Sequence, residues 1–179
     1  MKVGKFFHEE ITKRFDEKVA QLKRDLPKAS EMLSVNCAAL TLTSVLEVIG
    51  VESHFFYNLA VPLAGGFGGF RSMYDWKGPC GAVCGGCAAI GIILGGHDKM
   101  KPKDIPNAYL RASRYAHSFE KEFGSVSCSH LCGIDFSDAE GFQKYLDNNV
   151  WEKTCYKFVV FAVDQIRKIM SKELKKKWG

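Results

Sequence analysis

Seven cysteines are the residues in this 179-residue chain whose type and spacing could do chemistry. Cys80, Cys84 and Cys87 stand at positions i, i+4 and i+7, so a helix would place all three thiols on one face. Cys128 and Cys132 have the i, i+4 spacing and would also share a face. Thiolates are soft ligands that select iron–sulfur clusters, zinc or copper(I), so this clustering predicts a metal or redox site.

The two remaining cysteines, Cys37 and Cys155, each lie on the apolar stripe of a different predicted helix. Four separate elements could therefore direct sulfur to one place, with neighbouring sulfurs within roughly 7 Å if they share a cluster. The number of cysteines is odd, and no export signal is visible at the start of the sequence. We therefore expect a reducing, cytoplasmic setting, in which such cysteines bind metal or are redox-active. A free cysteine is also a common core residue, which could account for one or two of them.

Cys80 follows a Gly-Pro pair that is typical of a turn leading into a helix. The first turn of a helix stabilises negative charge, so this position favours a reactive or metal-bound thiolate. Gly81 and Gly85 follow, although glycine costs helix stability. Two partners could require them: a cluster that approaches the backbone closely, which makes both candidate cofactor-binding residues, or a tightly packed neighbouring helix.

Other cysteine motifs are less consistent with the sequence. The spacing of Cys80, Cys84 and Cys87 also matches the radical S-adenosylmethionine signature, but that motif follows a strand, and no alternating strand–helix pattern is present here. A thioredoxin-type pair at Cys84 and Cys87 lacks its preceding strand for the same reason. Ala88 stands where covalent haem attachment needs histidine, and the paired short spacings of a zinc ribbon are missing.

The elements that must position these cysteines are predicted to be helices. Apolar residues recur at helical spacing over 7–26, 30–50, 80–96, 104–124 and from about residue 151 onward. The sequence therefore predicts an all-α fold: a compact, single-domain helical bundle over residues 1–179, built around the Gly/Cys-rich helix that begins at Cys80.

Three of these helices have a predicted buried stripe. The stripes are Phe7, Ile11, Phe15, Val19, Leu22 and Leu26 in the first helix; Tyr109, Ala112, Ala116, Phe119 and Phe123 in the helix after Asp104; and Cys155, Phe158, Val159, Ala162, Ile166 and Met170 in the last.

The charge distribution excludes some partners. The net charge is +5, but residues 29–149, which hold all but one of the cysteines, carry nine basic and twelve acidic residues. We therefore expect no nucleic-acid binding. The best candidate for a membrane span, residues 80–96, is uncharged but has six glycines in seventeen residues, so we expect a buried helix there and no membrane span. Lys175, Lys176 and Lys177 are expected to be a solvated helix end.

Two segments carry a family resemblance. Gly65-Gly66-Phe67-Gly68-Gly69, followed by Cys80-Gly81-Ala82-Val83-Cys84-Gly85, resembles the Gly-rich segment and CGAxxG motif of the C_GCAxxG_C_C family of redox-active proteins. Cysteines at the family's other three places complete a similarity that covers about residues 33–170. The resemblance implies an ordered functional set but supplies no reaction. The set is Cys37, Cys80, Cys128 and Cys155.

The chain departs from this pattern at three positions. Cys84 and Cys132 stand where the family has a small residue such as threonine, and Cys87 is additional. We interpret all three as added ligands, for a larger cluster or a second one. An iron–sulfur cluster of unspecified type is therefore the expected cofactor.

The expected function is that of a cytoplasmic iron–sulfur protein. It would carry electrons for a redox partner protein or an oxidoreductase, and we leave open a homodimer and any enzymatic activity of its own. A thiol–disulfide redox protein, with Cys80 as thiolate and Cys84 or Cys132 as resolving thiol, is the second hypothesis. A zinc-stabilised interaction domain is the third.

Overall fold

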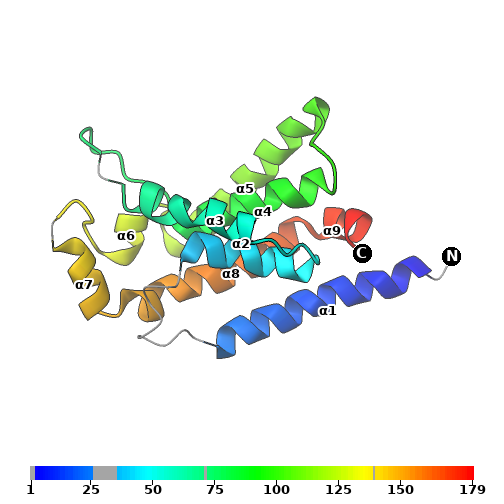
Figure 1. Cartoon of the computed structure of the whole chain (residues 1–179), viewed down its shortest axis with the longest axis horizontal. Coiled ribbons are helices and arrows are strands. Elements are labelled where there is room, and N and C mark those ends of the chain that lie inside the picture. Colours follow the sequence, from blue (N-terminus) through cyan, green and yellow to red (C-terminus); the bar gives the residue numbers. More distant parts are fainter. Residues whose placement is uncertain (1–2, 26–35, 71, 139) are drawn as a thin grey trace.

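Helices and helical turns are the regular elements of this computed structural model, which describes residues 3–25, 36–70, 72–138 and 140–179, with side chains from residue 10 onward (Figure 1). Within those residues no strand is present, and the all-α prediction is confirmed. The elements are α1 (Val3–Arg24), α2 (Cys37–Val48), α3 (His54–Leu63), the π-helical turn η2 (Ala64–Gly68), α4 (Gly81–Gly95), the 3-10 turn η3 (Pro102–Asp104), α5 (Ile105–Phe123), α6 (Cys128–Cys132), α7 (Gly141–Asp147), the π-helical turn η4 (Trp151–Cys155), α8 (Tyr156–Ile169) and α9 (Ser171–Lys177).

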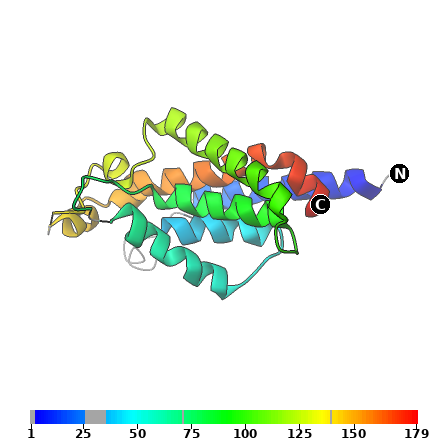
Figure 2. The ribbon, with the colours of Figure 1, turned by 90° about the horizontal axis from the view of Figure 1, so that it is seen from above.

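The Gly/Cys-rich helix α4 occupies the centre of the bundle. It packs against α2, α5 and α8, and the turn η2 and helix α9 also contact it (Figure 2). Helix α1 lies along α8 and α2. Helix α4 contains no charged residue, and its buried side chains include Ala82, Ala89, Ile90 and Ile93. The prediction of a central helix beginning at Cys80 is confirmed, with Cys80 itself as the residue that precedes its first turn.

Two predicted stripes face the core. In α1 the buried side chains are Ile11, Phe15, Val19 and Leu22, whereas those of Phe7 and Leu26 lie outside the described part of the chain. All six residues of the last stripe, from Cys155 to Met170, are buried. The expected start of the second helix at Ser30 lies outside the described residues. That helix is described from Cys37, where the Asn36 side chain accepts a hydrogen bond from the Ala39 N–H at 2.9 Å.

The predicted stripe of α5 is confirmed in its second half and wrong at Tyr109. Phe119 is buried and Ala116 and Phe123 pack against the core, but Tyr109 is 72% exposed. Tyr115, which was not predicted to face inward, is buried as well, because a Cβ on Gly86 would lie 2.5 Å from its ring and glycine leaves room for it. The Tyr115 hydroxyl donates to the Ala82 carbonyl at 2.9 Å, which satisfies its buried polar group.

The far end of α4 is capped by the C-terminal residues. The Trp178 indole N–H donates to the Ile93 carbonyl at 3.1 Å, and the Lys177 ammonium donates to the Leu94 carbonyl. These bonds satisfy carbonyls that the last turn of a helix leaves without partners. The side chains of Lys175 and Lys176 are exposed, as expected for a solvated end. Among the described helices, none has both the length and the apolar character to cross a membrane.

Candidate functional site

Two extended segments that pair with one another carry Cys80 and Cys128. Pro79 and Ser127 form an isolated antiparallel bridge, in which the Cys80 N–H donates to the Val126 carbonyl at 2.7 Å. In return the Cys128 N–H donates to the carbonyl of the residue before Pro79 at 3.0 Å. Helix α4 begins directly after this bridge, and α6 begins at Cys128. The bridge therefore holds the starts of these two helices, which are distant in the sequence, next to one another.

The Gly-rich turn η2 forms a wall over the bridge. A Cβ on Gly78 would lie 1.5 Å from the Phe67 carbonyl oxygen, so only glycine permits this approach. A Cβ on Gly68 would lie 3.3 Å from the Cys128 sulfur, which places this buried glycine directly against the thiol. Gly68 of the Gly-rich motif therefore has a structural reason: it brings backbone, without a side chain, against the Cys128 thiol.

Cys37 reaches the same place from the start of α2. A Cβ on Gly81 would lie 2.3 Å from the Cys37 sulfur, and one on Gly85 would lie 2.2 Å from the Ala38 carbonyl oxygen. Both glycines thus allow α2 to pack closely on α4, so the tightly packed neighbouring helix that the sequence left open is present. Contact of these glycines with a cofactor stays a prediction. The neighbouring Cys80 thiol, followed by burial, raises the pKa of Cys37 well above its usual value.

Cys155 completes the group from the end of η4. Its buried sulfur lies 3.6 Å from the Cys132 sulfur, which in turn lies 4.0 Å from the Cys128 sulfur. The Tyr145 hydroxyl donates to the Cys155 sulfur at 3.5 Å. The Cys132 thiol first, and then Tyr145, lower the pKa of Cys155 against the opposing effect of burial, because both donate to its thiolate.

Tyr145 was not identified from the sequence. It lies on α7, outside every cysteine motif, and no spacing rule links it to Cys155. Burial, followed by the charge of the nearby Cys155 thiolate, raises the pKa of the Tyr145 phenol above its ordinary range. The phenol therefore stays protonated and remains a hydrogen-bond donor to sulfur.

The additional cysteines of α4 lie at the edge of the group. Burial raises the pKa of Cys84 to about 12, with smaller contributions from the charges of Cys87, Cys37 and Cys128. Burial alone raises the pKa of Cys87 to about 11. Cys84 is therefore close enough to Cys37 and Cys128 to interact with them electrostatically, and Cys87 interacts with Cys84 in the same way. All seven cysteines are free thiols.

The sulfurs meet in contacts rather than around one point. Among the described residues, no three Cys, His, Asp or Glu side chains form a ready-made site for a metal ion. Cys37 adjoins Cys80, and Cys128, Cys132 and Cys155 form a row. An iron–sulfur cluster divides its thiolate ligands among several irons, so its ligands need no single common centre. The donor set fits such a cluster in kind, because it consists of soft, largely buried thiols.

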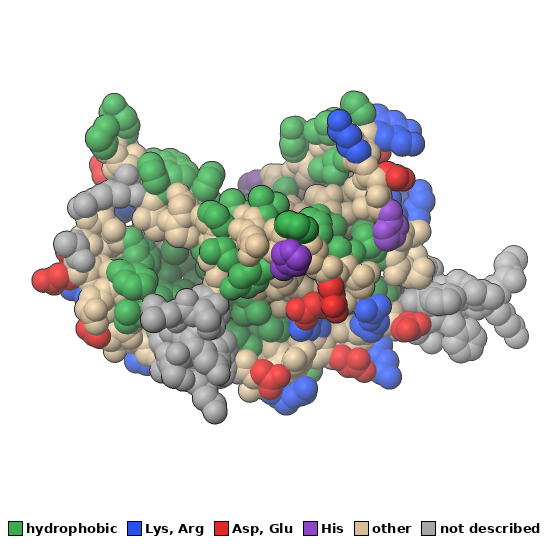
Figure 3. Space-filling model, in the orientation of Figure 1, with side chains coloured by type: hydrophobic (Ala, Val, Ile, Leu, Met, Phe, Trp, Pro, Cys, Tyr) green, Lys and Arg blue, Asp and Glu red, His purple; other side chains and the backbone are tan. Residues whose placement is uncertain are grey.

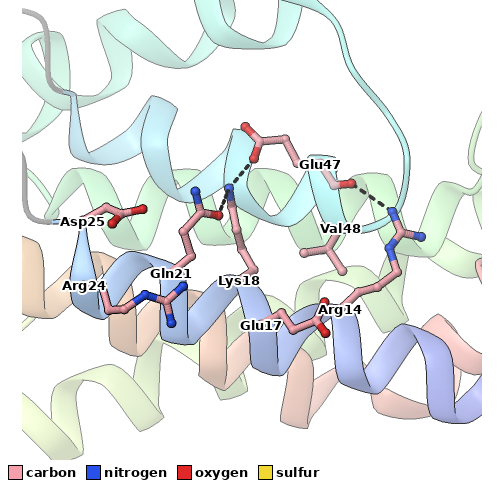
Figure 4. A pocket seen from close by; sticks show the side chains of 8 residues that line it. All are labelled: Arg14, Glu17, Lys18, Gln21, Arg24, Asp25, Glu47 and Val48. Carbon is pink, nitrogen blue, oxygen red and sulfur yellow. Dashed lines mark hydrogen bonds and ion pairs between the residues drawn. The ribbon is translucent and has the colours of Figure 1, made fainter.

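A separate hollow of about 480 Å³ lies between α1 and α2 (Figure 4). Lys18 bridges Glu47 and Gln21 there, and the Arg14 guanidinium donates to the Glu47 carbonyl at 3.3 Å. None of the eight lining residues is a cysteine, and exposed ion pairs of this kind stabilise by about 1 kcal/mol or less. The polar contacts across this hollow connect α1 with α2, and the hollow is separate from the cysteines.

One family model matches most of the chain. It carries the description "Putative redox-active protein (C_GCAxxG_C_C)" and matches residues 35–169. That range includes all seven cysteines and ends at the last residue of α8. No curated protein and no solved structure matches the chain.

Proposed function

The chain belongs to the C_GCAxxG_C_C family of putative redox-active proteins, and we propose that its cysteines hold an iron–sulfur cluster through which it transfers electrons. The observation that carries the proposal is the meeting of thiols from four elements, α2, α4, α6 and η4, with sulfur–sulfur contacts of 3.6 and 4.0 Å in the row from Cys128 to Cys155. A cysteine that serves only as a small core residue does not require other cysteines around it.

The family set supplies the proposed ligands: Cys37, Cys80, Cys128 and Cys155. Cys132 is the strongest additional candidate, because its sulfur contacts two of these four; Cys84 and Cys87 are the weaker ones. The cluster would supply one-electron transfer. The protein would contribute a mostly apolar enclosure and the Tyr145 hydroxyl, whose hydrogen bond to the Cys155 sulfur favours the more negative state.

The rest of the proposal concerns setting and organisation. We infer that the whole chain works as one domain, since helices from α1 to α9 all contribute residues to a continuous apolar core. We further propose a cytoplasmic protein that exchanges electrons with a partner protein or an oxidoreductase. A reducing compartment would keep these thiols available as ligands.

The visible absorption spectrum of anaerobically purified protein tests the cluster. Thiolate-bound iron is expected to give a broad band at roughly 400 nm that decreases on reduction with dithionite. The Cys80→Ser variant should be colourless at equal protein concentration. A colourless wild-type protein, after anaerobic reconstitution with iron and sulfide, would contradict the proposal.

A thiol–disulfide function is the second candidate, and the structure favours a different pair from the one expected. Cys132 and Cys155 are in contact at 3.6 Å, and the lowered pKa of Cys155 favours its thiolate. Their oxidation would join the two sulfurs and release two protons and two electrons to an acceptor disulfide such as oxidised glutathione. Peptide mapping after such oxidation should then yield a Cys132–Cys155 crosslink in colourless protein, whereas a cluster would protect both thiols.

A further inference from the structure

Helix α3 leaves its outer side without a partner. Among its residues only Ala60 is buried, while Phe55 is 72% and Leu59 is 65% exposed. A surface helix usually buries one side and presents polar residues on the other. Here His54 and Asn58 are exposed, but the large apolar side chains of Phe55 and Leu59 are exposed beside them.

The apolar surface continues through η2 into the loop that follows. Met73 and Tyr74 are 89% and 87% exposed, the highest values among the large apolar side chains. Trp76 packs edge-on against Phe67 and Phe70, with ring centroids 5.9 and 5.7 Å apart, so these rings hold one another in place. Figure 3 shows hydrophobic side chains gathered over α3 and on the projecting loop.

We call these residues the aromatic face. It consists of Phe55, Leu59, Phe67, Phe70, Met73, Tyr74 and Trp76. Side chains of this size expose roughly 150–250 Å² each when fully accessible, and these are on average about two-thirds exposed, which gives about 900 Å². The largest apolar patch of a typical monomer is about 300–600 Å². A stable protein interface takes about 800 Å² from each partner, so this face is large enough for one.

The charges of the aromatic face indicate its partner. Residues 54–70 contain no Asp, Glu, Lys or Arg, and residues 71–77 carry Arg71, Asp75 and Lys77, so the segment 54–77 has a net charge of only +1. The face therefore offers little charge to attract either an acidic or a basic protein. Two copies of a chain with net charge +5 repel each other in general, but only weakly across a surface with so little charge. Such a face is complementary to itself, and two-fold pairing requires only one face.

We propose that the aromatic face is the interface of a homodimer. Its composition is that of an interface core, rich in Phe, Tyr, Trp and Met and poor in charge. The turn η2 belongs both to this face, through Phe67, and to the wall over the Cys128 sulfur, through Gly68. Two-fold pairing would therefore set the cysteine sites of two copies on opposite sides of one interface, a consequence that rests on the proposed function.

Sedimentation equilibrium of the full chain tests the interface without reference to metal or redox activity. Wild-type protein should have twice the 20.0 kDa mass of one chain. Leu59→Glu and Met73→Glu should each weaken dimerisation by at least about a hundredfold, because each buries an unpaired charge. Both side chains are largely exposed in one chain, so the circular dichroism spectrum should be unchanged.

Leu110→Glu is the matched control. Leu110 is 50% exposed on α5, outside the aromatic face, and this variant should remain dimeric. Wild-type protein that is monomeric up to its solubility limit would overturn the proposal, and flotation of that monomer with phosphatidylcholine vesicles would assign the face to a lipid surface instead. Leu59→Glu and Met73→Glu variants that stay fully dimeric would also overturn it.

Discussion

The packing of α2 on α4 predicts opposite effects for the same substitution at two glycines of α4. A Cβ on Gly85 would lie 2.2 Å from the Ala38 carbonyl oxygen and 3.0 Å from its carbonyl carbon, so Gly85→Ala must separate the two helix backbones. A Cβ on Gly91 would meet nothing within 4 Å. Both positions lie in the same helix, so Gly91→Ala measures the intrinsic preference for alanine alone.

The magnitudes follow from these contacts. Replacing glycine by alanine in a helix stabilises by about 0.5–1 kcal/mol, which is the full effect expected for Gly91→Ala. Forcing a methyl group against backbone costs about 1–3 kcal/mol or more, so Gly85→Ala should lower the free energy of unfolding by about 1–2 kcal/mol after the helix preference is included. In a chain of this size, 1 kcal/mol shifts Tm by roughly 2–4 °C.

Thermal and urea unfolding, followed by circular dichroism, measure both variants. We expect Tm to rise for Gly91→Ala and to fall for Gly85→Ala. Gly85→Ala should also increase the reactivity of Cys37 toward a thiol reagent, because the start of α2 moves away from α4. If Gly85→Ala stabilises the protein as much as Gly91→Ala, the inferred close contact between the helices is refuted.

Four further predictions concern the site and the chain end. In metal-free, reduced protein, the pKa values of Cys84 and Cys87 are raised to about 12 and 11, whereas the same thiols of the unfolded chain lose their protons near pH 9.0. The folded protein therefore keeps both thiols protonated at a pH where the unfolded chain does not. The unfolding free energy should therefore be fully retained below that pH and fall as pH rises toward about 11 to 12, less steeply in Cys84→Ser. Tyr145→Phe removes a hydrogen bond to sulfur worth about 1 kcal/mol, so a redox titration should show a midpoint potential lower by roughly 40 mV; an unchanged potential would count against the contact. Deleting residues 175–179 removes two caps from the end of α4 opposite the cysteines, so Tm should fall by several degrees while iron per chain, measured after reconstitution, stays the same. Cys84→Ser, Cys87→Ser and Cys132→Ser should each reduce the iron content or change the electron paramagnetic resonance spectrum, and wild-type values in all three would show that these thiols only pack.

The all-α fold could be predicted because its information is local. The stripe from Cys155 to Met170 follows helical periodicity, and all of its members are buried. The helix after Asp104 was predicted over residues 104–124, and Gly124 ends it with a φ of +79°, the left-handed conformation that favours glycine. Each of these features depends on residues within a few positions of one another.

The burial of Tyr115 could not be predicted in the same way. Helical periodicity within α5 favoured Tyr109, whereas the space for the Tyr115 ring is left by Gly86 on another helix. The contact between Cys132 and Cys155 has the same origin. The sequence assigns each cysteine to an element, but the docking of α6 against η4 determines which sulfurs touch.

The reason for the Gly-rich segment is likewise tertiary. The resemblance to a family pointed to residues 65–69 as a motif, but spacing alone could not connect Gly68 with Cys128, which is sixty positions away. The bridge between Pro79 and Ser127 involves a single residue pair, too short for any strand pattern. Such long-range contacts bring together cysteines that lie far apart in the sequence.

Iron and acid-labile sulfide per chain, determined together after anaerobic reconstitution, test the central claim most directly. The wild-type protein should bind iron and sulfide in comparable amounts and show an electron paramagnetic resonance signal in one oxidation state. Cys80→Ser should bind neither, since cluster binding requires the converging thiolates. Wild-type protein that retains no iron and no sulfide, while its seven thiols remain reduced and reactive, would contradict the account.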